Sequence, residues 1–353
     1  MGKLAVYKYL SFMVLVITLL TAVFTLFAIF GGDANPTINT ALAMLVYILP
    51  FLIVGDAVLL IFWLLKRRWH WAAIPAVALL CSINYIGTIY QPGLFNGHSD
   101  DVKSGIKIAS YNVALFGRET SGFKAEDILS EMKNNQVDVF CMQEYNDVSG
   151  DKLNSDSYKE YFTYMATGRK DMVIYSRFPI RETQVIDFGQ TNNSGMWADI
   201  DVNGRLLRVF NVHLETTGFN RTLHKVAKQE MNGVKVENNA ILHAIFDNYT
   251  RGMVVRARQA DLVAHAMEAA EIPVILCGDF NDVPYSFVYH LLLGDAMVDG
   301  FKECGSGFMY TFRGSKKARI DYIFHSKELK GETYYKQDMS YSDHFPVFMK
   351  IAL

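Results

Sequence analysis

Two regions with different hydrophobic patterns follow one another along the chain. Before Gln91, apolar residues fill three stretches at about 10–30, 41–65 and 71–90. Each stretch approaches or exceeds the ~20 residues that an α-helix needs to cross ~30 Å of hydrocarbon. We therefore predict a membrane anchor at residues 1–95 that contains three transmembrane helices and uses the lipid bilayer as its partner.

Basic residues predict how this anchor is oriented. Lys3 and Lys8 precede the first stretch and residues 66–68 (Lys-Arg-Arg) follow the second, whereas the other flanking segments carry no Lys or Arg. The positive-inside bias places the N-terminus in the cytoplasm, so a third crossing puts the remainder outside. We expect a multi-pass protein, of bacterial inner-membrane type, with an extracytoplasmic C-terminal domain. If the third stretch, which contains Pro75, did not span, that domain would face the cytoplasm.

Asp56 is a carboxylate inside the second apolar stretch. Intramembrane ionisable residues are functional candidates by default. Here a structural role is favoured, such as pairing with Asn84 or a place near a helix end.

After a linker at 96–105, short β-type runs alternate with helical stretches. Several runs are apolar almost throughout, which is typical of strands buried on both faces. Strands are expected at 106–113, 137–144, 172–176, 196–202, 206–214, 273–277, 320–325 and 347–351. Helices are expected at 124–134, at 253–270 and shortly after Pro284, and 221–249 is a polar, partly helical insertion. The pattern predicts an α/β domain at 106–353 with two packed sheets and helices outside.

Polar residues occupy the ends of many of these apolar runs. In Ile275–Asp282 (ILCGDFND), a buried strand ends in Asp279 and, two positions on, Asn281. Similar ends carry Asn112, Glu144, His213, Asp343 with His344, and Asp321 opens one more run. Each has a simpler interpretation as a cap, a solvated strand end, a core histidine or a turn. Together they indicate one site, because independent accidents would not place acid, amide and imidazole groups at so many strand ends.

This set of side chains fits phosphate ester hydrolysis. The reaction needs neutralised phosphate oxygens, a positioned water and a stabilised leaving oxygen. Mg²⁺ or Mn²⁺ prefers oxygen ligands, so the expected metal residues are Glu144, Asn112 and Asp343. Expected catalytic residues are Asp279 at the water, Asn281 at a phosphate oxygen, and a phosphate-contacting His344 oriented by Asp321.

Composition narrows the substrate class only mildly. Residues 1–98 carry five of the 34 basic residues and two of the 36 acidic residues, which leaves the remainder with a net charge of −5. Tight nonspecific duplex binding rests on many Lys/Arg contacts, so this acidity argues against it. The four cysteines are interpreted as free thiols. The sequence carries neither a Gly-rich phosphate loop nor a zinc-spaced Cys/His cluster.

The polar strand ends resemble the successive motifs of the endonuclease/exonuclease/phosphatase family, with its DNase I-like fold. The matching segments occur in the family's order and are SYNV at 110–113, MQE at 142–144, NVHL at 211–214, GDFND at 278–282, RIDYI at 319–323 and SDHFP at 342–346. The segment YSRFPI at 175–180 also matches. The resemblance implies a four-layer α/β sandwich, Mg²⁺ dependence and cleavage of a phosphodiester or phosphomonoester. It also implies a second catalytic histidine at His213.

Three positions bear on the subclass that the resemblance implies. Members similar to deoxyribonucleases and sphingomyelinases carry a histidine where this chain has His213, whose acidic partner is Asp171 or Glu215 by proximity in sequence. Ala114 and Asn146 stand where deoxyribonuclease-type members tend to place arginines that meet the nucleic-acid backbone. These departures move the interpretation away from a duplex nuclease.

The resulting hypothesis is a membrane-anchored phosphoesterase whose substrate is a lipid headgroup or another extracytoplasmic phosphate ester, attacked in line by a metal-assisted water. The alternative within the enzyme class is a nuclease that acts on DNA or RNA. A further alternative is a non-catalytic membrane receptor on a retired hydrolase scaffold. No obligate protein partner is inferred, because fold alone does not decide substrate or partner.

Overall fold

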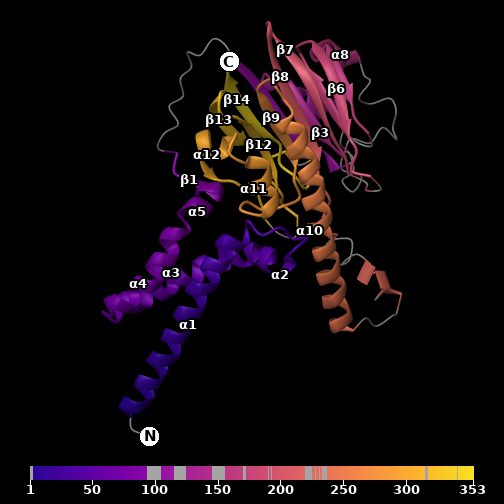
Figure 1. Ribbon diagram of the computed structural model, residues 1–353. Helices are drawn as coiled ribbons and strands as arrows, with labels where there is room; N and C mark the ends of the chain where they lie inside the picture. The colour runs from indigo at the N-terminus through magenta and orange to yellow at the C-terminus, as the bar shows by residue number, and fades with distance from the viewer. Residues whose placement is uncertain are drawn as a thin grey trace. The chain divides into compact units, whose positions relative to one another are not determined.

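The protein is described here from a computed structural model (Figure 1). The described residues are all except 1–2, 94–104, 115–124, 145–155, 170–171, 190, 192, 219–224, 227, 230, 233–236, 315–316 and 340. The expected linker at 96–105 therefore falls almost wholly outside the described residues. The chain divides into two compact units, each treated by itself: Met1–Thr88 with Val283–His290, and Ile89–Asp282 with Leu291–Leu353.

The first unit is helical. Its elements are α1 (Lys3–Gly31), α2 (Thr40–Ala43), a 3₁₀ turn η1 (Met44–Ile48), α3 (Leu49–Leu65), α4 (Trp69–Cys81) and α5 (Ile83–Ile89). Two helical segments, Val6–Gly31 and Thr40–Leu65, are long and apolar enough to cross a membrane. The third expected span is a pair of helices, α4 and α5, bent by 50° where they meet, and the pair counts as a crossing if it forms one span.

Two side-chain hydrogen bonds join α1 to α3 within this unit. Asp56 in α3 is fully buried, and Thr25 of α1 donates to Asp56 Oδ2 over 2.6 Å. Trp63 of α3 likewise donates to Thr18 of α1 over 2.9 Å. The expected partner Asn84 is exposed, so the pairing of Asp56 with Asn84 was wrong. The α1 helix can supply both bonds because Thr18 and Thr25 are seven residues, about two turns, apart and so lie on the same face.

The second unit is built on two six-stranded mixed sheets. One has the order β10-β12-β9-β8-β7-β6 and the other the order β13-β14-β2-β3-β5-β4. The first sheet comprises β6 (Ile180–Ile186), β7 (Gly195–Val202), β8 (Arg205–His213), β9 (Val274–Asp279), β10 (Met297–Asp299) and β12 (Asp321–Ser326). The second comprises β2 (Gly105–Asn112), β3 (Val139–Gln143), β4 (Tyr164–Thr167), β5 (Val173–Ser176), β13 (Lys330–Lys336) and β14 (Val347–Ala352). A short pair, β1 (Tyr90–Gln91) and β11 (Gly307–Phe308), stands apart.

Alternation along each strand builds the layers. In β2, Ile106 and Ile108 enter the apolar core shared by the two sheets, whereas Ala109 and Tyr111 face a second cluster. That second cluster contains Ile128 and other residues of α7 (Ala125–Asn134), together with residues of α8 (Asp156–Tyr161). The α10 helix (Asn238–Glu268) bonds through Arg256 and Gln259 to Glu215, two residues after the end of β8. The expected fold, two mixed sheets packed together with helices outside and preceded in the sequence by apolar helices, is confirmed.

All eight strands expected from the sequence are present, with ends shifted by one or two residues. The unexpected strands include β4, β6 and β13, which lie at sheet edges or are largely exposed and therefore lack a run of buried residues. The expected helix at 253–270 is the second half of α10. Most of the described part of the insertion at 221–249 forms the first half of the same helix. Short helices α11 (Phe287–Leu293) and α12 (Gly300–Cys304) follow Pro284. All four cysteines are free.

A buried ion pair joins the start of α12 to the segment just before β12. Arg319 and Asp299 are both almost completely buried, and Arg319 Nη1 donates to Asp299 Oδ2 over 2.8 Å. Asp299 also caps α12 by accepting from the Phe301 amide. Removing one partner of such a pair leaves an uncompensated buried charge.

We expect the substitution Asp299→Asn to lower the free energy of unfolding by about 3–5 kcal/mol. The exposed pair of Arg181 and Asp201 is the matched control, because Arg181 is 60% exposed and water already screens it. Thermal unfolding of the full chain should show a large drop in the midpoint for Asp299→Asn and little change for Asp201→Asn. Equal midpoints would contradict this prediction.

Candidate active site

The candidate site lies where the core between the two sheets ends. Strand alternation places Asn112 on the face of β2 that carries Ile106 and Ile108 in the core. By the same alternation, polar residues end the inward face of four further strands: Gln143 in β3, Asn211 and His213 in β8, Asp279 in β9 and Asp321 in β12. On each strand, the inward-facing positions are thus apolar along the core and become polar at one end, with no change of register.

Strand pairing brings these ends together. The parallel pairs β2/β3 and β8/β9 align Asn112 with Gln143 and His213 with Asp279, and antiparallel β12 places Asp321 opposite Asp279. Gly278, with φ +142°, lets β8 and β9 approach, because a Cβ there would lie 1.9 Å from the Val212 carbonyl oxygen. The glycine of the GDFND segment is therefore a packing requirement.

Glu144 reaches the cluster through a left-handed backbone. It directly follows β3 and has φ +52°, a conformation that non-glycine residues rarely adopt. Strict alternation after Gln143 would direct Glu144 to the other face, and the left-handed residue interrupts that alternation. Asn112 Nδ2 donates to Glu144 Oε1 over 3.2 Å and to Asp279 Oδ2 over 3.0 Å. Two of the three expected metal residues, Glu144 and Asn112, are therefore in direct contact.

The loop after β9 fixes the Asp279 carboxylate. The Asn281 backbone N–H donates to Asp279 Oδ1 over 2.8 Å, and Asn281 Nδ2 lies 3.3 Å from Asp279 Oδ2. Asn281 Nδ2 also donates to the Leu214 carbonyl over 2.9 Å, and the residue has φ +50°. In this structure the Asn281 amide therefore orients Asp279 and ties its loop to the end of β8.

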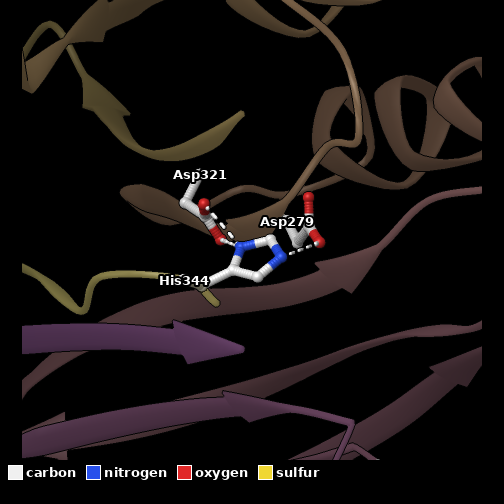
Figure 2. Close-up of side chains that lie close together, drawn as sticks. All are labelled: Asp279, Asp321 and His344. Atoms are coloured by element: carbon white, nitrogen blue, oxygen red, sulfur yellow. Dashed lines mark hydrogen bonds and ion pairs between the residues drawn. The ribbon is translucent and has the colours of Figure 1, made fainter. Parts of the chain in front are cut away.

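His344 lies between two carboxylates (Figure 2). Its Nδ1 is 3.0 Å from Asp321 Oδ2, and its Nε2 is 3.8 Å from Asp279 Oδ2. All three side chains are almost completely buried. The expected orientation of His344 by Asp321 is thus present, and it leaves Nε2 directed to the side of Asp279.

Burial and crowding shift the pKa values of this group. Burial and the neighbouring Asp321 carboxylate raise the pKa of Asp279 to about 7. Burial lowers the pKa of His344, but the carboxylates of Asp321 and Asp279 outweigh it and raise that pKa to about 10. His344 is therefore an imidazolium at neutral pH, whereas Asp279 is close to its titration midpoint.

His213 also lies beside Asp279, near the same carboxylate oxygen that faces His344. Its Nε2 is 3.7 Å from Glu144 Oε1 and 3.9 Å from Asp279 Oδ2. Burial lowers the pKa of His213. Its Nδ1 has no partner among the described residues. Of its two expected acidic partners, Asp171 falls outside the described residues, and Glu215 bonds through its backbone to Gln259 and Arg256. Asn146, which bears on the subclass, also falls outside the described residues.

Asp343 is placed differently from the other expected metal residues. Its side chain is exposed, and its negative charge contributes to raising the pKa of the adjacent His344. No described contact joins Asp343 to Glu144 or Asn112, so its expected role as a ligand stays a prediction.

One group of donor atoms could hold a metal ion. Ligand atoms of Asp279, Asp321 and His344 all lie within 4.8 Å of one another. A histidine binds metal through its neutral form, and both carboxylates favour protonated His344. Because protonation of His344 competes with metal binding, the oxygen donors of Glu144 and Asn112, which lie beside Asp279, are the better candidate metal ligands.

Sequence reasoning assigned no role to three buried supporting residues. Gln143 Nε2 donates to Asn211 Oδ1 over 2.7 Å, and Asn211 Nδ2 donates to the carbonyls of Met142 and Val173, which links the two sheets beneath the site. Thr311 Oγ1 accepts from the backbone N–H groups of Ile320 and Asp321. The apolar-run pattern already contained Gln143 and Asn211, but nothing in the sequence around Thr311 marks it.

Comparisons with known proteins agree with this architecture. Residues 109–344 match the model of the endonuclease/exonuclease/phosphatase family, and residues 11–89 match a domain of unknown function, DUF8431. The chain is 24% identical over 281 residues to the CCR4-Not complex 3'-5'-exoribonuclease subunit Ccr4 of Phaeosphaeria nodorum. That match covers 65% of this chain and 46% of the relative, so the chain spans less than half of that relative's length.

Two solved structures show the same fold. The match to the crystal structure of humanized D. rerio TDP2 covers 70% of this chain and 99% of the TDP2 chain, with a TM-score of 0.52 and 18% identity. An endonuclease/exonuclease/phosphatase from Bacteroides vulgatus covers 71% and 100%, with a TM-score of 0.52 and 15% identity. The family model covers well over half of the chain and spans every residue of the polar cluster. This chain belongs to the endonuclease/exonuclease/phosphatase family.

Proposed function

We propose that the chain hydrolyses a phosphodiester, in a lipid headgroup or another extracytoplasmic phosphate ester, with the help of Mg²⁺ or Mn²⁺. The observation that carries the proposal is the buried array of Asp321, His344 and Asp279 beside the Glu144–Asn112 pair. It puts a base and a cationic donor next to oxygen ligands for a hard cation. The base can activate the attacking water, and the cationic donor and the metal ion can neutralise the phosphate oxygens, as phosphate ester hydrolysis requires.

The residues present fit a divalent cation. Glu144, Asp279 and Asp321 bring three carboxylates together, and no lysine or arginine in the described part of the chain pairs with them. The His344 imidazolium balances one of these negative charges. Buried carboxylates beyond that one are costly without a further cation, and hard cations choose such oxygen donors. Glu144 and Asn112 would hold the ion. When bound, a divalent ion supplies charge neutralisation for the phosphate oxygens.

Asp279 serves as the proton acceptor for water in this proposal. A general base works best when its pKa is close to the operating pH, and burial beside Asp321 raises the pKa of Asp279 to about 7. The Asn281 N–H and the Asn112 amide hold its two oxygens in place. Fixed geometry of this kind lets the carboxylate direct one water in line with the scissile bond.

His344 stabilises the phosphate. Its Nδ1–H donates to Asp321, which fixes the ring, and its protonated Nε2 is free to donate to a phosphoryl oxygen. The pKa of about 10 keeps this group cationic through the physiological range. His213, whose pKa is lowered by burial, faces Glu144 and is placed to donate or accept as a neutral imidazole.

The substitution Glu144→Gln is expected to weaken the metal site selectively. A neutral amide is a poorer ligand for a hard cation than a carboxylate, so the Mg²⁺ concentration for half-maximal activity should rise at least about tenfold. Titration of Mg²⁺ against hydrolysis of bis(4-nitrophenyl) phosphate measures it. The exposed Glu271→Gln is the control. An unchanged Mg²⁺ requirement in Glu144→Gln would place the ion elsewhere.

The N-terminal helices support a lipid substrate. Two of them are long and apolar enough to cross a membrane, which confines the chain to a bilayer and raises the local concentration of lipid phosphate esters. A nuclease activity is the second candidate, favoured by the likeness to the exoribonuclease subunit Ccr4. The retired-receptor alternative is weakened, because each of the five residues expected to be catalytic contacts another of the five.

A substrate panel separates these candidates. The full chain is assayed in Mg²⁺ with phospholipid vesicles, RNA and plasmid DNA, and Asp279→Asn serves as the blank in each. We expect Asp279-dependent phosphate ester cleavage of the vesicle lipids. Cleavage of RNA or DNA alone would favour the nuclease, and Mg²⁺ binding without any turnover would favour the receptor.

Reporter fusions after Tyr90 test the expected extracytoplasmic side.

A further inference from the structure

One face of α10 carries three buried residues that touch the loop after β8: Gly252, Arg256 and Gln259. They are four and three residues apart, a spacing that places side chains on the same side of a helix. Gly252 lies so close to the loop that a Cβ added to it would be 2.8 Å from the Thr216 carbonyl oxygen. We call these three residues the α10 contact face.

The α10 contact face bonds both backbone groups of Glu215. Arg256 Nη1 donates to the Glu215 carbonyl over 2.8 Å, and Gln259 Oε1 accepts from the Glu215 N–H over 2.7 Å. Backbone N–H and C=O are strong hydrogen-bonding groups, so these two bonds hold the residue to the helix. Glu215 follows His213 by two residues, and the chain is therefore fixed directly after the end of β8.

Arg256 also bonds the loop after β9. It is fully buried, and its Nε donates to Asp282 Oδ2 over 3.2 Å. Asp282 is adjacent to Asn281 and three residues after Asp279. A single planar guanidinium thus spans a carbonyl after β8 and a carboxylate after β9, which the fixed fork of its N–H groups allows. Arg256 therefore joins the two loops that follow the candidate catalytic strand ends.

The same two loops are also bonded to each other. The Leu214 N–H donates to the Asp279 carbonyl over 3.0 Å, and Asn281 Nδ2 donates to the Leu214 carbonyl over 2.9 Å. His213 and Asp279 are register partners in the parallel pair β8/β9, and His213 Nε2 lies 3.9 Å from Asp279 Oδ2. A displacement of either loop would therefore change the distance between these two side chains.

We propose that the α10 contact face sets the spacing of the β8 and β9 loops and so holds His213 and Asp279 in the geometry that hydrolysis requires. Arg256 is the central positioning residue, because it bonds both loops. It acts through them and does not touch the substrate. This inference rests on the proposed function for its kinetic readout, whereas hydrogen exchange tests the loops independently.

The principal test is Arg256→Lys in the full chain, purified in detergent. Lysine keeps the positive charge, so Asp282 does not become an uncompensated buried charge and the fold should persist. The ammonium group lacks the guanidinium fork and cannot bond Asp282 and the Glu215 carbonyl in the same geometry. Because small displacements of reacting groups lower the rate strongly, kcat for bis(4-nitrophenyl) phosphate should fall at least about tenfold, with KM within about twofold of wild type.

Amide hydrogen exchange locates the change within the sheet unit. In Arg256→Lys, exchange should accelerate in peptides that cover 213–218 and 278–282 and should stay at the wild-type rate in peptides from β2 and β14.

The substitution Gly252→Ala tests the β8 side by itself. Alanine is a better helix former than glycine, so α10 should not be weakened. Its Cβ must, however, displace the Thr216 backbone. We expect kcat to fall at least about threefold, with the larger acceleration of exchange in 213–218.

Two controls separate positioning from general loosening. Arg258→Lys makes the same substitution two residues along α10, at an exposed site. Val202→Ala removes core packing at the end of β7 that pairs with Arg205, opposite to the end of β8 that carries His213. Both variants should keep the wild-type kcat, although Val202→Ala should lower the unfolding temperature.

Wild-type kcat and loop exchange in a folded Arg256→Lys protein would overturn the proposal. A loss of kcat in Val202→Ala as large as that in Arg256→Lys would also overturn it, because general loosening would then explain both. If the wild-type chain hydrolyses nothing in Mg²⁺, the proposed function fails, and exchange alone decides the role of Arg256. Acceleration confined to the two loops would then support that role, and unchanged exchange would refute it.

Discussion

Replacing Asp279 by Asn is expected to lower kcat for a phosphodiester by about 10²- to 10⁴-fold while the protein remains folded. The amide that replaces the carboxylate cannot accept a proton from water. Two of the amides that now surround the carboxylate, from Asn112 and the Asn281 backbone, supply only donors to it. The new side chain therefore also loses part of its orientation, and kcat should fall more than KM changes.

The control for this prediction is Asp261→Asn on α10. The Asp261 side chain is 60% exposed and its closest ionic partner is the exposed His265. Steady-state kinetics of both variants, with thermal unfolding of each, separates a chemical effect from a loss of structure. Wild-type kcat in a folded Asp279→Asn protein would remove Asp279 from the reaction.

Replacing His344 by Gln is the second large effect, with an expected loss in kcat of about 10²- to 10³-fold. The Asp321 carboxylate and the buried setting make His344 a charged donor at neutral pH, and glutamine offers a neutral one. A preorganised donor matters most in the transition state, where negative charge develops on the phosphoryl oxygens. The effect should therefore appear in kcat.

A second buried histidine allows a matched comparison. His325 lies in β12, like Asp321, is fully buried, and has its Nε2 2.7 Å from Glu303 Oε2. Its pair with an acid resembles that of His344, but it belongs to the opposite end of the strand. The substitution His325→Gln should cost stability and leave kcat nearly unchanged. Equal losses of kcat in the two variants would mean that burial of an imidazole, and not its place in the cluster, is what matters.

The sequence predicted the central strands and the residues at their ends because both follow from one pattern. A strand buried on both faces is a run of apolar residues, and a polar residue that ends such a run stands out, as Asp279 does in ILCGDFND. The strands β6 and β13 were not predicted, because edge strands expose much of their surface and carry mixed residues. The helical unit was predicted, like the core strands, from runs of apolar residues, because the length of such a run is enough to indicate a helix that could span a membrane.

Other features depend on contacts that no local pattern encodes. The left-handed backbone of Glu144 places its side chain beside Asn112, and Thr311 anchors Asp321 from a loop of unremarkable composition. The position of Val283–His290 in the helical unit depends on residues that are more than 190 positions away, at Gly32 and Tyr85. Pairings of this kind arise from the whole fold, and a single sequence read segment by segment does not contain them.

Hydrolysis of bis(4-nitrophenyl) phosphate by the full chain, first stripped of metal with EDTA and then titrated with Mg²⁺, tests the central claim most directly. The cluster of Glu144, Asp279 and His344 predicts no turnover without metal, recovery on addition of Mg²⁺, and no recovery in Asp279→Asn. Turnover that survives EDTA, or that Mg²⁺ restores equally in the Asp279→Asn chain, would contradict it.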